Sequence, residues 1–300
     1  MIHAAGLTKC FNGHTAVNAI SLDIAKGQIF GLLGPNAAGK TTTIRMLCGI
    51  IEADAGEILI DEMRVAQAKM GFGYVAQSFG QYEELSVWEN LQFYAQMYGV
   101  NDEQRLHLLL QRYALEPFKD QMAGALSGGY QRRLALACAL AHDPKILFLD
   151  EPTAGIDPVT RKLLWDDFYQ LSAQRKTLFV TTHYMEEAQR CHQLAFMAAG
   201  NMIATGTPDT IKEALGEVKV YTTQTPYLPA LHHVLRESEG IVLINQFGTE
   251  LRVIVKPEVT LTSLENIIND VIDQPTPLQI SEPNLEDVFI ALTQDKAVTA

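Results

Sequence analysis

The chain has 300 residues, of which 47% are apolar and 19% charged, and its formal net charge is −12. This composition is typical of a globular protein and not of a disordered one. The acidic balance argues against binding to the phosphate backbone of DNA or RNA, so no nucleic-acid partner is expected. No apolar run approaches the roughly 20 residues that span a bilayer, and the N-terminus lacks the features of a signal peptide. The four cysteines lack metal-ligand spacing, and we expect them to be reduced.

The N-terminal third begins with β-structure. Short strands are predicted over residues 2–7, 16–23 and 28–33, separated by turn-forming pairs such as Asn12-Gly13. Further strands are expected over residues 56–61 and 73–77.

Residues 34–42 fit the pattern G-x-x-x-x-G-K-[ST] of a phosphate-binding loop, between an apolar strand and a helical pattern. Glycines at positions 34 and 39 let backbone N–H groups turn toward a phosphate, and the helix start adds its positive dipole end. We expect Lys40 to contact the β- and γ-phosphates of a nucleoside triphosphate and the Thr41 hydroxyl to bind Mg²⁺. The predicted nucleotide-binding loop consists of Gly34, Pro35, Asn36, Ala37, Ala38, Gly39, Lys40, Thr41 and Thr42.

Residues 86–125 follow a helical pattern. Ser86 and Glu89 are spaced as a capping box, and apolar side chains then recur at helical spacing from Leu91 to Tyr98. The sequence therefore predicts a helical insertion between two β-rich stretches.

An apolar strand over residues 145–149 ends in two adjacent carboxylates, Asp150 and Glu151. Asp150 is expected beside the phosphate loop, where it would hold the Mg²⁺ shell, and Glu151 is expected to polarise an attacking water. From Lys145 onward, strands alternate with helices, which predicts right-handed crossovers and a parallel sheet with helices on both faces.

The run Leu126-Ser-Gly-Gly-Tyr-Gln131 places bare glycine N–H groups before a helix and offers a second anion site. With this run, the chain resembles the nucleotide-binding subunits of ATP-binding-cassette (ABC) transporters over about residues 2–215. The resemblance implies ATP and Mg²⁺ as cofactors and a dimer with a second copy or a close paralogue. In such a dimer Ser127, Gly128 and Gly129 of one subunit would cap the γ-phosphate held by the phosphate loop of the other.

The resemblance also assigns individual roles. Gln77 would contact Mg²⁺ and water, and His183 would contact the γ-phosphate as a switch histidine. Asp157 ends the loop 154–157 that would pass between subunits, and Phe11 would stack on adenine. The implied catalytic residues are Glu151, His183, Gln77 and Lys40, and the implied metal ligands are Thr41, Gln77 and Asp150.

Three positions depart from the family pattern. The family usually has glycine at position 37, serine at 41 and glutamine at 130, where this chain has Ala37, Thr41 and Tyr130. Alanine at position 37 costs little unless its φ is positive. Thr41 keeps the hydroxyl that Mg²⁺ requires, and Tyr130 leaves Ser127 and the glycine N–H groups in place, so ATP hydrolysis is still expected.

The fold implied by the resemblance is α/β: a P-loop NTPase cassette of the ABC type with a mixed sheet, a RecA-like core, an antiparallel β part and a helical insertion. We expect this ATPase domain over residues 1–215, with its helical subdomain at about 86–125. Residues 216–300 are predicted to form a small accessory α+β domain, because their strands and helices follow the order βαββαβ with an extra helix. The strands are expected at 218–222, 241–245, 251–255 and 277–280, and the helices at 228–237, 261–272 and 285–292.

The C-terminal run 283–292 and the insertion residues 85–91 resemble the exporter branch of the family, which serves drugs, polysaccharides, lipids and antibiotics. The implied function is ATP-driven dimer closure that powers a separate integral-membrane permease from the cytoplasmic face of the membrane. A surface made of Gln77, Tyr82, Leu85 and the 86–125 helices is expected to receive a permease helix. The alternative is a soluble ABC-type ATPase that acts on ribosomes or DNA. The single cassette, the lack of heptads and the acidic balance favour the transporter.

Overall fold

The structure is a computed structural model that describes residues 2–272 and 276–297. It divides into two units, residues 1–205 and 206–300. The sequence placed the domain boundary at 215/216 instead. The difference is helix α8 (Pro208–Glu213), which contacts the C-terminal helix and buries Ile211, and so groups with the second unit.

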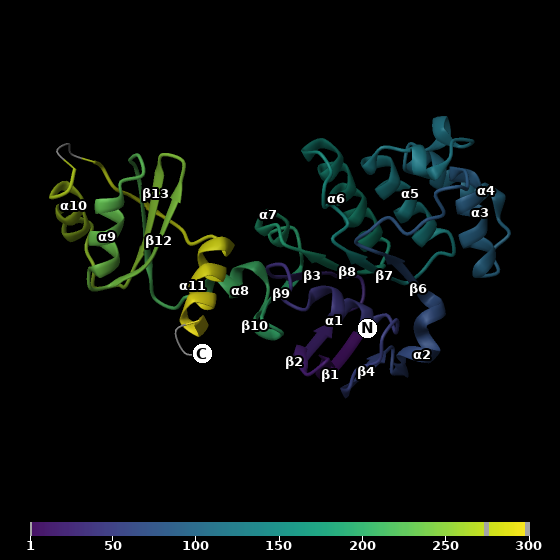
Figure 1. The fold of residues 1–300 in the computed structure, drawn as a ribbon, viewed down its shortest axis with the longest axis horizontal. Coiled ribbons are helices and arrows are strands. Elements are labelled where there is room, and N and C mark those ends of the chain that lie inside the picture. The colour runs from purple at the N-terminus through teal and green to yellow at the C-terminus, as the bar shows by residue number, and fades with distance from the viewer. Residues whose placement is uncertain (1, 273–275, 298–300) are drawn as a thin grey trace. The chain divides into compact units, whose positions relative to one another are not determined.

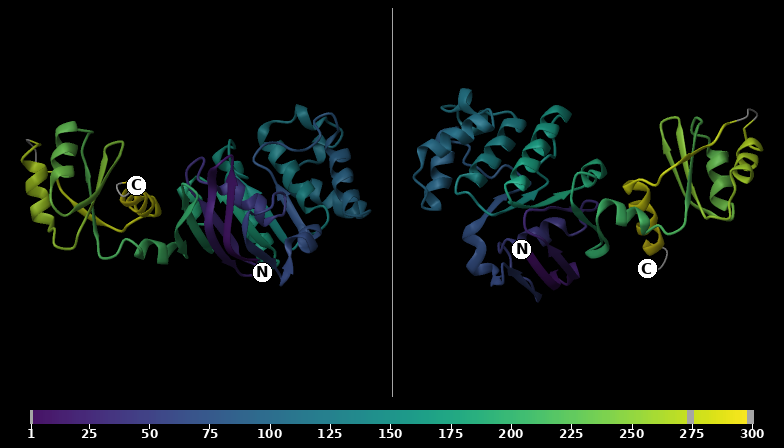
Figure 2. Two further views of the ribbon diagram at one scale, coloured as in Figure 1. Left: turned by 60° about the horizontal axis from the view of Figure 1, so that its bottom comes forward. Right: turned by 180° about the vertical axis from the view of Figure 1, so that it is seen from behind.

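The first unit combines a parallel sheet, an antiparallel sheet and a helical insertion (Figures 1 and 2). Its strands are β1 (Ile2–Phe11), β2 (His14–Ile24), β3 (Ile29–Leu33), β4 (Ala55–Ile60), β5 (Met63–Arg64), β6 (Phe72–Val75), β7 (Ile146–Asp150), β8 (Thr177–Thr182), β9 (Gln193–Ala198) and β10 (Asn201–Gly206). Its helices are α1 (Lys40–Leu47), α2 (Val65–Ala68), α3 (Val87–Met97), α4 (Glu103–Arg112), α5 (Gly128–Leu140), α6 (Pro158–Ala173) and α7 (Met185–Ala188), with 3₁₀ turns at Lys69–Gly71, Glu116–Phe118 and Ala123–Ala125.

The central sheet has the strand order β10-β9-β3-β8-β7-β6. Strand β3 pairs in parallel with β8 and β9, and β7 pairs in parallel with β6 and β8. Every residue of β3, β7 and β8 is buried, as expected for parallel strands covered on both faces. Helices α1 and α6 lie on opposite faces of these strands (Figure 1). The predicted parallel sheet with helices on both faces is confirmed.

The register of this sheet decides where the functional loops meet. Leu33 lies opposite Thr182, and Asp150 lies opposite Thr181. The phosphate loop follows Leu33, Glu151 follows Asp150, and His183 follows Thr182. Because parallel strands end at one common edge, three segments distant in sequence come together there.

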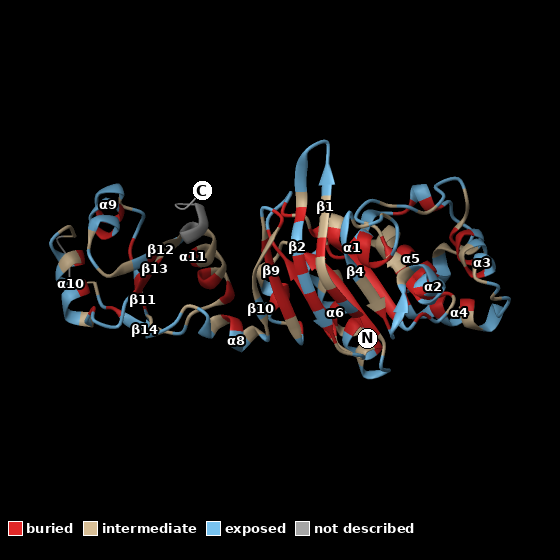
Figure 3. Cartoon of the chain, turned by 90° about the horizontal axis from the view of Figure 1, so that it is seen from below, coloured by how far each residue is buried: buried red, intermediate tan, exposed pale blue. Residues whose placement is uncertain are grey.

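A second sheet, with strand order β2-β1-β4-β5, is antiparallel. Along β2 exposed and buried residues alternate, and the buried face joins α1 and the central strands in one apolar core that contains Ile2, Ile20, Phe30 and Ile44. Figure 3 shows the buried residues along these strands and the exposed tip of the β1–β2 hairpin. The antiparallel β part expected from the family resemblance is therefore present.

The helical insertion lies between β6 and α5, as the sequence predicts. The capping box is formed: Glu89 N donates to Ser86 Oγ at 3.2 Å, and Ser86 N donates to Glu89 Oε2 at 2.8 Å. The fully buried Asn90 exchanges hydrogen bonds of 2.9 Å with the backbone of Tyr82 and bonds the carbonyls of Leu85 and Ser86. This amide holds the entry of the insertion in one conformation.

The second unit is a four-stranded antiparallel sheet of order β12-β13-β11-β14 with helices. The elements after α8 are β11 (Lys219–Gln224), α9 (Pro229–Glu237), β12 (Ile241–Phe247), β13 (Glu250–Val255), α10 (Leu261–Asn269), β14 (Gln279–Ser281) and α11 (Leu285–Ala297). The strands and helices from β11 to β14 follow the predicted order βαββαβ, and α11 is the extra helix. Buried Asp287 of α11 accepts a 2.8 Å hydrogen bond from Arg252 Nη2, which fixes this helix to β13.

Among the residues that the structure describes, no helix is both long and apolar enough to cross a membrane.

Candidate nucleotide-hydrolysis site

The phosphate loop connects β3 to α1 and lines a cavity of about 460 Å³. Gly39 has a φ of +104°, and a Cβ at this position would lie 2.4 Å from the carbonyl oxygen of Ala16, so only glycine fits. Lys40 is buried, and its ammonium donates to the carbonyl oxygens of Gly34 at 2.9 Å and Pro35 at 3.1 Å. The cavity is lined by His14, Ala16, Asn36, Ala37, Ala38, Gly39, Lys40, Thr41, Thr42, Gln77 and Glu151.

Asp150 lies at the end of β7 and is fully buried. Its Oδ1 accepts hydrogen bonds from Thr181 Oγ1 at 2.6 Å and from Thr41 Oγ1 at 3.3 Å. Its Oδ2 is buried without a hydrogen-bond partner among the described residues. Burial raises the pKa of Asp150, and the hydrogen bonds from Thr181 and Thr41 oppose this rise. A carboxylate oxygen left without a partner beside a threonine hydroxyl fits a hard divalent cation such as Mg²⁺.

Within the described ranges no group of three His, Cys, Asp or Glu side chains could hold a metal by itself.

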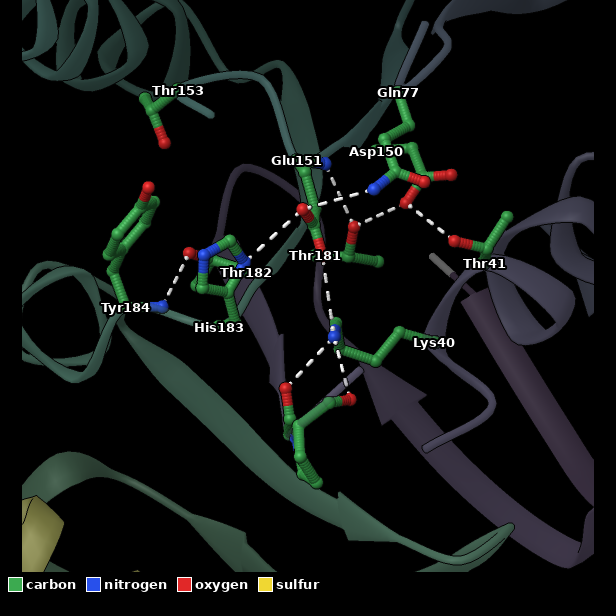
Figure 4. A network of polar contacts seen from close by, with 12 residues as sticks. Lys40, Thr41, Gln77, Asp150, Glu151, Thr153, Thr181, Thr182, His183 and Tyr184 are labelled. Carbon is green, nitrogen blue, oxygen red and sulfur yellow. Dashed lines mark hydrogen bonds and ion pairs between the residues drawn. The ribbon is translucent and has the colours of Figure 1, made fainter. Parts of the chain in front are cut away.

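Glu151 is the centre of the contacts in this site (Figure 4). Its Oε1 lies 3.4 Å from Lys40 Nζ, and its Oε2 lies 3.2 Å from both Gln77 Nε2 and His183 Nδ1. The residue is only 5% exposed. The structure therefore brings three of the predicted catalytic residues, Lys40, Gln77 and His183, into contact with the fourth, Glu151.

The backbone at Glu151 is held in an unusual conformation. Its φ is +47°, which a residue with a side chain rarely adopts, and its N–H donates to Thr181 Oγ1 at 2.9 Å and also to the Thr181 carbonyl at 3.1 Å. Thr181 thus orients both carboxylates, because its hydroxyl also donates to Asp150. The sequence analysis did not select Thr181. The sequence feature that could have pointed to Thr181 is its position near the end of β8, the strand beside β7.

The remaining predicted site residues lie outside this cavity. Phe11 is 46% exposed at the end of β1, and His14, its partner in the β1–β2 register, lines the cavity instead. Ser127 precedes α5, and a Cβ at Gly128 or Gly129 would meet no atom within 4 Å, so both glycines face open space. Asp157 accepts hydrogen bonds from Val159 N and Thr160 N and caps α6.

Arg132 is a further residue that the sequence analysis missed. Its guanidinium donates from Nη1 to the carbonyl oxygen of Ala76 at 2.8 Å and from Nη2 to the carbonyl oxygen of Gln77. It thereby connects helix α5, which begins with the glycine pair, to the backbone of Gln77. The sequence feature that could have pointed to Arg132 is its position five residues after Ser127, in the helix that follows the glycine pair.

Comparisons with known proteins agree with this geometry. Residues 17–154 match the family model described as ABC transporter. The Nod factor export ATP-binding protein I of Bradyrhizobium diazoefficiens is 37% identical over 308 aligned positions, which cover 97% of this chain and 96% of that protein. The chain belongs to the ABC transporter ATP-binding proteins. It is an ATP-binding cassette of the ABC ATPase class.

Two further similarities describe the cassette itself. The probable multidrug ABC transporter ATP-binding protein YbhF of Escherichia coli (strain K12) is 38% identical over 71% of this chain, but the chain spans only 38% of that relative's length. A solved structure of the ATP-binding subunit of an ABC transporter has 27% sequence identity and a TM-score of 0.67, and the similarity covers 72% of this chain and 93% of that one. The predicted fold class is confirmed.

Proposed function

We propose that this chain is the ATP-hydrolysing subunit of an ABC exporter and that it drives a separate membrane permease. The observation that supports this most strongly is the convergence of Lys40, Gln77 and His183 on Glu151 at the mouth of the phosphate loop. The relatives support the exporter branch, because one is named for Nod factor export and another for multidrug transport. None of the relatives compared above is named for ribosomes or DNA, so that alternative is not proposed.

Each proposed catalytic residue would have its own task in ATP hydrolysis. Lys40 and the loop N–H groups bind the β- and γ-phosphates and hold the terminal phosphorus in place. Glu151, which lines the cavity, accepts the proton of the attacking water. Gln77 and His183 contact the same carboxylate oxygen, so they orient it and add hydrogen-bonding groups next to the γ-phosphate.

The magnesium ion would be held by the Thr41 hydroxyl and by Asp150, with Gln77 at the edge of its shell. When bound, Mg²⁺ neutralises the phosphate charge that develops during transfer. The free Asp150 Oδ2 supports this assignment.

We propose that the site is completed across a dimer of two cassettes. Gly128 and Gly129 present N–H groups at the start of α5 with open space above them, and neither lines the cavity of its own chain. Their N–H groups and the Ser127 hydroxyl would bind the γ-phosphate held by the other subunit, because a helix N-terminus favours an anion. Phe11 would stack on the adenine ring beside His14.

The permease would dock on the helical insertion near Gln77, on the cytoplasmic face of the membrane. Tyr82 is 48% exposed and Phe93 37% exposed, and their rings meet edge to face at 4.9 Å. An exposed aromatic pair next to a residue that contacts Glu151 supports a partner surface that senses the nucleotide.

Affinity purification from detergent-solubilised membranes, followed by mass spectrometry, tests the transporter proposal. The tagged chain should recover a polytopic membrane protein in stoichiometric amount. Replacement of Phe93 by serine should weaken binding of that protein by about thirtyfold, since aromatic hot spots contribute about 2 kcal/mol or more to an interface. ATP binding should be unchanged. Replacement by serine of Tyr227, an exposed aromatic residue outside the insertion, serves as the control. Recovery of the chain alone, or with ribosomes, would contradict the transporter proposal.

A further inference from the structure

Behind the catalytic contacts lies a second carboxylate, Glu187, to which the sequence analysis gave no role. It belongs to the short helix α7 that follows His183, and it is only 1% exposed. Its Oε1 accepts a 2.6 Å hydrogen bond from Thr153 Oγ1, and its Oε2 accepts a 2.6 Å hydrogen bond from Thr182 Oγ1. Each carboxylate oxygen therefore binds a hydroxyl from a different loop.

Each of the two threonines directly precedes a segment that lies near Glu151. Thr153 directly precedes the loop 154–157, and Thr182 directly precedes His183. Thr182 Oγ1 also accepts from the N–H of Tyr184 at 3.1 Å, so the Thr182 hydroxyl that Glu187 holds also fixes the backbone just after His183 (Figure 4). Movement of either loop would require a change in the hydrogen bonds of Glu187.

A second connection runs parallel to the first. Arg161, in the first turns of α6, has its Nε 3.8 Å from Glu187 Oε1, and its guanidinium lies over the Tyr184 ring at 4.4 Å. The Tyr184 ring packs in turn on the ring of His183, with centroids 4.1 Å apart. Arg161 N donates to the carbonyl oxygen of Asp157, the last residue of the loop 154–157. The first connection links the loop 154–157 to His183 through Glu187. The second links them through Arg161, which lies next to Glu187.

We propose that Glu187 is a positioning residue that holds the loop 154–157 and His183 in one common geometry. A shift of the loop 154–157 against a second subunit would then be passed on to His183, which already lies 3.2 Å from Glu151 in the single chain. The inference rests on the proposed function, because it assumes hydrolysis at a site completed by a second subunit. It concerns the rate of the chemical step and not nucleotide affinity, since Glu187 does not line the cavity.

The test compares E187A and E187Q by steady-state ATP hydrolysis and by equilibrium binding of ATP. E187A removes both acceptors and should lower kcat by about tenfold or more, because small displacements of catalytic groups have effects of this size. Its affinity for ATP should stay within about threefold, which would be a loss of rate without a loss of binding. E187Q can still bond both threonine hydroxyls, which donate as well as accept, and should restore kcat to within about threefold of the wild type.

Asp167 offers a matched control in the same unit. It belongs to α6 and accepts two 2.6 Å hydrogen bonds, from Arg112 Nε and Tyr113 Oη, and neither of these partners lies in a nucleotide loop. D167A should lower the melting temperature. At temperatures where the variant is still folded, its kcat should equal that of the wild type. Should E187A fail to fold, T153V and T182V replace it, since valine keeps the shape of threonine without the hydroxyl.

In the valine variants each single change should lower kcat. The double change should lower it no further than the more severe single one, because both remove the same connection. If the wild type hydrolyses ATP and E187A, or both valine variants, have the same kcat as the wild type, the inference is overturned. Loss of ATP hydrolysis in the wild type itself would instead contradict the proposed function.

Discussion

Single residues in the phosphate loop show how backbone geometry and side-chain identity interact. Ala37 has a φ of +64°, where the family usually has glycine. The sequence analysis made the cost of this alanine conditional on a positive φ, and the structure fulfils that condition. The loop thus holds a left-handed alanine that a Cβ disfavours.

Replacing Ala37 by glycine should therefore stabilise the protein. The expected gain in the free energy of unfolding is about 1 kcal/mol, because relief of the left-handed strain outweighs the greater entropy of glycine in the unfolded chain. Denaturant unfolding measures this change. The neighbouring buried Ala38, which has no positive φ, is the control: A38G should destabilise by about 1 kcal/mol. Equal effects of the two substitutions would show that φ at position 37 does not govern stability.

Residue types in motifs were predictable from the sequence, and their contacts were not. Lys40, Asp150, Glu151 and His183 each follow a buried strand or open a helix, so their arrival at one edge of the sheet follows from the strand pattern. Thr181 and Glu187 belong to no charged motif, and their roles depend on strand register and on side-chain packing. Neither strand register nor side-chain packing can be read from a local pattern in a single sequence.

At the scale of elements, the strands of the central sheet were the most predictable part. The apolar run of β7 has one reasonable conformation, and the structure places this strand within one residue of its predicted position. The short elements were harder. Helix α7 and strand β10 were not predicted, because a four-residue helix or an edge strand has little periodicity of its own.

The junction of the helical insertion with the central sheet contains a titratable contact. His142, just after α5, stacks on Tyr98 at the end of α3 with ring centroids 3.6 Å apart, and its Nε2 donates to the Phe72 carbonyl of β6 at 3.0 Å. Burial lowers the pKa of His142 below its ordinary 6.5. Arg105 and Lys176 lower it further, while the Phe72 hydrogen bond and Asp143 oppose the shift. Three elements therefore meet at a ring that is neutral in the folded state.

This junction should weaken in acid. As the pH falls below 6.5, the unfolded chain takes up a proton at His142 before the folded chain does, so stability decreases until the folded-state pKa is passed. In H142F the phenylalanine ring can still stack on Tyr98, but the titratable imidazole and its hydrogen bond to the Phe72 carbonyl are lost. The free energy of unfolding at pH 8 should fall by about 1 kcal/mol, and the loss of stability between pH 7 and pH 5 should be smaller than in the wild type.

Urea unfolding across this pH range measures the effect, and the exposed His233 provides the control. H233F should keep the pH slope of the wild type. If H142F and the wild type lost stability in parallel, His142 would not be the group responsible.

For the whole molecule, the composition and the element order predicted two units of different architecture. The ATP-binding unit follows from its motifs, because a phosphate loop, two carboxylates and a glycine pair limit the folds that can use them. The boundary was less predictable, since it depends on the packing of α8 against α11 and not on a change in composition. That the second unit serves as an accessory domain stays a prediction.

In the proposed function, Glu151 drives ATP hydrolysis at a site shared by two subunits. The most direct measurement is phosphate release by the wild type and by E151Q, with the size of each protein in MgATP determined by light scattering. E151Q should lose at least about a hundredfold in rate, as expected on removing a general base. With hydrolysis blocked, it should remain dimeric in ATP and monomeric without it. An E151Q variant that hydrolyses ATP at the wild-type rate, or that stays monomeric with ATP bound, would contradict the account.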